Sequence, residues 1–161
     1  METSTTNLAA AAETDLPPQT WAVLTAAVAE MASKLFPNST VALRVMDDAA
    51  IRRLNCDFLG VDAATDVLSF PADNTYPADH AGDIALSWES AVRQAKVNNH
   101  TAEAEAVELL AHGLLHLAGL DHGTASARRR MEARTADLLD YVSQRGAGCE
   151  IISSEVDAFG R

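Results

Sequence analysis

Apolar positions along the chain follow two periods, and their order predicts an α+β fold. Spacings of three and four residues predict helices over 17–36, 47–60, 88–97, 102–118 and 124–144. Strict alternation or short apolar runs predict strands over 41–45, 66–70 and 84–86. The expected architecture is a small mixed β-sheet of three to four strands packed against about five helices, with the last two strands antiparallel.

The ends of the chain lack this patterning. Residues 1–16 are rich in Thr and Ala and are predicted to form a flexible tail, or at most a weak edge strand around residues 7–11. Residues 17–146 are expected to form a single domain, and residues 147–161 a second loose tail.

The composition of the chain excludes some classes of function. The 161 residues carry a formal net charge of −11, which excludes a strongly basic nucleic-acid-binding domain. Any RNA partner would need a local basic patch. No apolar run reaches the length of a membrane helix, so no membrane partner is expected. Cys56 and Cys149 form no C-x-x-C pair and are expected to be reduced thiols, and the N-terminus lacks a signal-peptide core. We expect a cytoplasmic protein.

Three histidines within eleven residues predict a metal site. His112 and His116 are four residues apart on a predicted helix, so their rings leave the same face. Gly119 ends this helix, and the chain can then turn so that His122 approaches as a third ligand. Three imidazoles with one open position are typical of a catalytic zinc site. We therefore expect one Zn²⁺ per chain, with a water on the metal as the nucleophile and no side chain assigned as general acid or base.

Other residues near this cluster receive weaker predictions. His80 and His100 fall in predicted loops and are expected to be solvated, and Glu105 and Glu108 are given no role. The histidine spacing also occurs in metzincin proteases, but those enzymes need a glutamate directly after the first histidine. Gly113 occupies that position here, so a zinc peptidase is the least favoured alternative.

Three blocks of sequence resemble one known family. The segment 112–122 reads H-G-x-L-H-L-x-G-x-D-H, which looks like the signature of the YbeY family of small metal-dependent endoribonucleases. Residues 62–71 resemble the family's D-x-x-T-D-V-L-S-F-P block, with Asn55 preceding it, and residues 82–87 resemble its G-D-I-x-I-S strand. The blocks follow the family's order and spacing and cover roughly residues 20–145.

The resemblance implies a function and a ligand set. Family members are linked to ribosomal RNA maturation and ribosome quality control, and their metal ligands correspond to His112, His116 and His122. The implied activity is single-strand-specific endoribonuclease hydrolysis of phosphodiesters. The implied partners are ribosomal RNA and the ribosome, or a ribosomal protein or GTPase, with no DNA expected. A different class remains open, namely a ribosome-associated assembly factor whose metal is mainly structural.

One departure from the family concerns phosphate contacts. Family members usually carry an arginine after the aromatic residue of a Y-R-G-x-D pattern, whereas this chain has Phe58 and then Leu59. Candidate substitutes for that arginine are Arg52 and Arg53, with a solvated helix face as the favoured alternative. Separate candidates for a phosphate contact, at the start of the last helix, are Arg128, Arg129 and Arg130, with a solvated role as the alternative. Asp66 and Ser69 either line the cleft or only support the strand. Asp121 either orients a histidine or stabilises its turn.

Overall fold

A computed structural model describes residues 1–4, 7–75 and 77–146. These residues form five helices and one five-stranded sheet, so the α+β class expected from the sequence is confirmed. In chain order the elements are β1 (Glu2–Ser4), β2 (Leu8–Ala12), α1 (Pro18–Leu35), β3 (Thr40–Met46), α2 (Asp48–Leu59), β4 (Val67–Pro71), β5 (His80–Ser87), α3 (Trp88–Asn98), α4 (Ala102–Leu117) and α5 (Ala125–Gln144).

The sheet is mixed, and its strand order is β1-β2-β3-β5-β4. The inner pairs β2–β3 and β3–β5 are parallel, whereas the outer pairs β1–β2 and β4–β5 are antiparallel. The antiparallel β4–β5 pair was expected from the sequence. Pro71 fits at the end of β4 because this strand lies at the edge of the sheet, where a missing N–H breaks no inner ladder.

The N-terminal residues are not a tail, and that prediction is wrong. Strand β2 overlaps the weak edge strand considered around residues 7–11, but it lies inside the sheet between β1 and β3. Leu8 is fully buried, and the Asn7 side chain donates to the Ser39 carbonyl at 2.9 Å. Alanines have low strand propensity, so the sequence signal is weak, and the open edge of β3 supplies the pairing that propensity does not.

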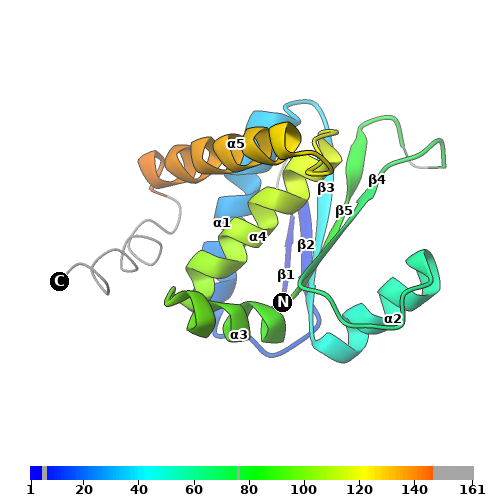
Figure 1. The fold of residues 1–161 in the computed structure, drawn as a ribbon, viewed down its shortest axis with the longest axis vertical. Helices are drawn as coiled ribbons and strands as arrows, with labels where there is room; N and C mark the ends of the chain where they lie inside the picture. Colours follow the sequence, from blue (N-terminus) through cyan, green and yellow to red (C-terminus); the bar gives the residue numbers. More distant parts are fainter. Residues whose placement is uncertain (5–6, 76, 147–161) are drawn as a thin grey trace.

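Helices cover the two faces of the sheet unequally. Helices α1, α3, α4 and α5 lie on one side and α2 lies on the other (Figure 1). The main core joins α1, α4 and α5 to β2, β3 and β5, and its largest members include Leu24, Met31, Leu110 and Leu114. A smaller cluster under α2 contains Met46, Ile51, Leu68 and Ala85. Helix α4 is therefore held from several sides and forms a fixed base for the residues it carries.

Within the described ranges, no helix combines the length and apolar character needed to cross a membrane. Cys56 is an exposed free thiol. Cys149 and the predicted tail over 147–161 lie outside the described residues.

Candidate metal centre and its cleft

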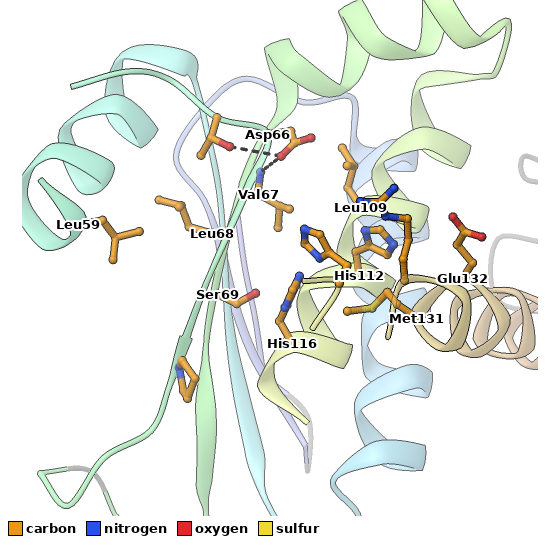
Figure 2. A pocket seen from close by; sticks show the side chains of 14 residues that line it. Leu59, Asp66, Val67, Leu68, Ser69, Leu109, His112, His116, Met131 and Glu132 are labelled. Atoms are coloured by element: carbon orange, nitrogen blue, oxygen red, sulfur yellow. Dashed lines mark hydrogen bonds between the residues drawn. The ribbon is translucent and has the colours of Figure 1, made fainter. Parts of the chain in front are cut away.

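Helix α4 and the turn after it bring the three histidines together. Thr101 caps α4 by accepting a hydrogen bond from the Ala104 N–H at 3.1 Å. Gly119 then adopts a φ of +96°, a left-handed conformation that glycine reaches without strain, and the chain reverses there. The ring centroids of His112 and His116 are 6.5 Å apart, and those of His116 and His122 are 5.2 Å apart. Figure 2 shows His112 and His116 pointing into the space between β4 and α5.

The electrostatics of the cluster favour an uncharged His116 ring. Burial is the largest cause that lowers the pKa of His116 below its ordinary 6.5, and the nearby His122 and His112 lower it further. The Leu120 backbone and Asp121 act in the opposite direction without reversing the shift. At neutral pH the His116 ring is therefore neutral, and a neutral imidazole has the lone pair that a metal ligand needs.

The donor set fits a zinc ion with an accessible coordination position. All three imidazoles line an open cleft, and three histidine ligands with an open position are typical of catalytic zinc sites, whereas structural sites use four protein ligands and usually cysteines. Cys56 lies on α2 and is not among the residues that line this cleft.

The cleft beside the histidines has a volume of about 730 Å³. One wall consists of α4, the turn after it and the start of α5, and the other consists of β4 with the segment before it and the end of α2. Its lining residues are Leu59, Thr65, Asp66, Val67, Leu68, Ser69, Pro71, Leu109, His112, His116, His122, Arg128, Met131 and Glu132. This volume lies within the range of cavities that bind small ligands.

The two walls meet closely at Gly113. The Ser69 hydroxyl donates to the Gly113 carbonyl at 2.9 Å. A Cβ at position 113 would lie 3.1 Å from Ser69 Oγ and 3.3 Å from methyl groups of Ile84 and Val67. Position 113 therefore faces the sheet and has no room for a glutamate, which argues against the zinc peptidase alternative.

Both Asp66 and Ser69 line the cleft, and their hydrogen bonds show what holds them. The Asp66 carboxylate accepts from the Val67 N–H at 2.7 Å and from the Gln94 side-chain amide at 3.0 Å (Figure 2 shows the former). Both carboxylate oxygens are engaged, so Asp66 fixes the start of β4 against α3.

Asp121 supports the turn that carries His122. Its side chain accepts from the Gly123 N–H at 3.2 Å, which is the Asx-type bond considered from the sequence. Its charge also acts on His116, because it is one of the groups that raise that pKa. The two roles proposed for Asp121 are therefore compatible.

The arginines singled out in the sequence occupy different environments. Among them, Arg128 lines the cleft, whereas Arg129 and Arg130 follow it on α5 and are exposed outside the lining. Arg52 is exposed on α2 and pairs with Asp62 at 2.8 Å, and Arg53 beside it is also exposed. Leu59, where the family places its arginine, lies on the cleft wall and is 57% exposed.

The expectation that His80 and His100 are solvated is wrong. The His80 side chain is 14% exposed and pairs with Asp83 at 2.7 Å. His100 is half-buried, and its Nδ1 lies 3.2 Å from Glu105 Oε2. The loop assignment misled this prediction, because α3 and α4 meet tightly at His100 and bury it.

Sequence reasoning also missed two features. Glu132, one helical turn after Arg128, lines the cleft, and the i, i+4 spacing from Arg128 was a usable signal. The second feature is a group formed by His100, Glu105 and Glu108. Glu105 and Glu108 were expected to be solvated, but Glu105 is only 4% exposed.

Comparisons with known proteins agree with this geometry. A family model described as Endoribonuclease YbeY matches residues 7–143. An Endoribonuclease YbeY from Gloeobacter violaceus is 48% identical over 108 residues, which are 63% of this chain and 56% of the relative. One from Moorella thermoacetica is 44% identical over 115 residues, which are 65% of this chain and 74% of the relative. The chain thus spans little more than half the length of the Gloeobacter protein.

A solved structure supports the fold. The solution structure of TM1509 from Thermotoga maritima is similar with a TM-score of 0.61 and 25% identity, and the match covers 86% of this chain and 89% of that one. Since the family model spans most of the chain, including all three histidines, this protein belongs to the endoribonuclease YbeY family.

Proposed function

We propose that this protein is a zinc-dependent endoribonuclease that hydrolyses phosphodiesters in single-stranded RNA and acts in ribosomal RNA maturation and ribosome quality control. The observation that carries the proposal is that His112, His116 and His122 are neighbours and line one open cleft, in a chain of this family.

The three histidines would hold the metal. A zinc ion bound there supplies a Lewis acid for a phosphoryl oxygen and lowers the pKa of water to roughly 7. The chain's own contribution is the arrangement of these ligands. The packing of α4 fixes His112 and His116, and the Gly119 reversal with the Asp121–Gly123 bond fixes the segment that carries His122.

Arg128 is the cation placed to contact a phosphate. It lines the cleft from the first turn of α5, beside the histidines. A guanidinium can donate two parallel hydrogen bonds to phosphate oxygens, and it offsets the charge that develops during hydrolysis. Arg52, Arg53, Arg129 and Arg130 are proposed only as outer contacts to the RNA chain, because they do not line the cleft.

The overall charge indicates how the substrate arrives. A net charge of −11 repels RNA at long range, so delivery depends on the ribosome or a partner protein. We expect weak binding of naked RNA at physiological salt and stronger activity on ribosomal particles. Tight binding of naked RNA at that salt would contradict this expectation.

The direct test is single-turnover cleavage of a precursor ribosomal RNA fragment by the purified protein. Cleavage should depend on added Zn²⁺, stop with a chelator and return when excess metal is restored. A contaminating nuclease is excluded when His116→Ala, purified in the same way, does not cleave.

A second candidate function is favoured by one observation. Leu59 places an apolar side chain on the cleft wall where the family has an arginine. An assembly factor with a mainly structural metal would bind pre-ribosomal particles without cleaving RNA. Metal-dependent cleavage in the single-turnover assay would exclude it, and particle binding without cleavage would favour it.

A further inference from the structure

The junction of α3 and α4 holds a second group of metal-ligating side chains. Helix α3 ends at Asn98, the capping residue Asn99 after it adopts a left-handed φ of 56°, and α4 begins after the capping residue Thr101 (Figure 1). His100 lies between these two residues. Glu105 is in the first turn of α4, and Glu108 follows three residues later on the same side of the helix.

The side chains of this group converge. One ligand atom each from His100, Glu105 and Glu108 can be chosen so that all lie within 4.8 Å of one another. His100 Nδ1 is 3.2 Å from Glu105 Oε2. The Asn98 amide donates to the two oxygens of Glu105 at 3.2 and 3.4 Å, which holds that carboxylate towards His100.

Burial makes the charge of this group costly. Glu105 is 4% exposed, and Glu108 is half-buried beside it. Two carboxylates this close repel each other. A divalent cation would neutralise both and would take the His100 ring as a neutral ligand.

The donor set indicates the class of cation. One imidazole nitrogen with two carboxylate oxygens suits first-row divalent ions such as Zn²⁺ and Mn²⁺ better than Ca²⁺ or Mg²⁺, which prefer oxygen alone. The half-buried His100 and Glu108 leave the group within reach of solvent, so an ion can enter.

We propose that His100, Glu105 and Glu108 form a second divalent-cation site that fastens the start of α4 to the end of α3. It is separate from the three-histidine cluster. None of its three residues is among those that line the cleft of the histidines. The site stabilises the base of the helix that carries the cluster.

The test counts metal in the full-length protein, free of any affinity tag and dialysed against Zn²⁺. The wild type should bind two Zn²⁺ per chain, His116→Ala one, Glu108→Gln one, and the double variant none. In the His116→Ala background, Zn²⁺ should raise the unfolding temperature, and Glu108→Gln should remove that rise. When the same variants are loaded with Mn²⁺, electron paramagnetic resonance should show the same losses of protein-bound ion.

Matched controls separate ligation from loss of structure. Glu103→Gln changes a carboxylate in the same first turn, outside the proposed site, and should keep the full metal count. His100→Gln removes the nitrogen donor and should act as Glu108→Gln does, while circular dichroism verifies that each variant is folded. A folded His116→Ala protein that binds no Zn²⁺ would overturn the second site and leave the proposed function intact. One Zn²⁺ in both the wild type and His116→Ala would instead overturn the three-histidine site.

Discussion

The two walls of the cleft differ in how they are built and in how closely they follow the family. The α4 wall carries His112 and His116 on a helix packed by α1, α3, α5 and the sheet. The opposite wall ends in the last turn of α2, where Phe58 is 68% exposed and Leu59 is 57% exposed. The buried wall, on α4, carries two of the histidines that the resemblance predicts as ligands, whereas the exposed wall, at the end of α2, has Leu59 where the resemblance predicts an arginine.

This difference indicates that the two walls of the cleft have different roles. A metal ligand must be held closely in position, and the packing around α4 supplies that rigidity. The end of α2 rests on a cluster of four buried residues, and the hydrophobic side chains packed against that cluster are only partly buried. Substitutions there cost little stability, so the exposed wall can change its substrate contacts without disturbing the metal cluster.

The largest effect is expected on the buried wall. His116→Ala should lower the single-turnover cleavage rate by at least about hundredfold, because the central ligand of the proposed zinc site is lost. The fold should survive, since the His116 ring is only partly buried. His80→Gln is the matched control, because His80 is half-buried on β5 and pairs with Asp83 instead. Equal cleavage by His116→Ala and the wild type would place the activity elsewhere.

The next largest effect is expected at Gly113, where the two walls of the cleft are in contact. Gly113→Ala should destabilise the fold by roughly 1–3 kcal/mol, because its Cβ would approach Ser69, Ile84 and Val67 to 3.1–3.3 Å. Urea unfolding followed by circular dichroism measures this change. Gly123→Ala meets its nearest atom only at 3.9 Å and should change stability by less than about 0.5 kcal/mol. If the two variants unfold alike, the walls are looser than the structure describes.

The exposed wall is tested by restoring the family's residue. Leu59→Arg should raise the cleavage rate by about tenfold, because a guanidinium on the cleft wall can stabilise developing phosphate charge. Val61→Arg adds the same charge at a residue that is 48% exposed and outside the cleft lining, and should give no increase. A protein without nuclease activity would gain nothing from either substitution.

The smallest effect is expected at Asp48, whose side-chain contacts anchor the start of α2. Asp48 accepts hydrogen bonds from Ser87 at 2.6 Å and Ser90 at 2.8 Å and pairs with Arg93. Burial raises the pKa of Asp48, but the bonds from Arg93, Ser87 and Ser90 together outweigh burial and lower it below 3.8. Asp48→Asn should therefore cost roughly 1 kcal/mol of stability at pH 7.

The stability that the Asp48 carboxylate contributes should decrease as the pH is lowered. The folded pKa is below the unfolded one, so the carboxylate's contribution is fully present above about pH 4 and is lost as the pH falls through the folded value. The difference between wild type and Asp48→Asn in urea unfolding should shrink accordingly. Asp62→Asn removes an exposed pair with Arg52 and should not change stability measurably. A difference that does not shrink as the pH falls below 3.8 would contradict the assignment.

Much of the fold could be predicted from local signals. The five helices, including the caps Asp47, Ser87, Thr101 and Thr124, follow from apolar periodicity and capping residues. Strand β1 was not predicted, and β2 was predicted only as a weak edge strand around residues 7–11, because alanines have low strand propensity and pairing with β1 and β3 is what places β2 inside the sheet. His100 was misjudged for a related reason, since its burial depends on how two helices pack.

The sequence by itself determined the histidine spacing, the helix that carries His112 and His116, and the reversal at Gly119, because these depend on interactions a few residues apart. Only the tertiary structure decided that Leu59, Asp66 and Arg128 share one cleft, that Gly113 faces β4 and β5, and that Glu105 is buried beside His100. These facts depend on packing between segments distant in the chain, and a local pattern carries no information about which surfaces will meet.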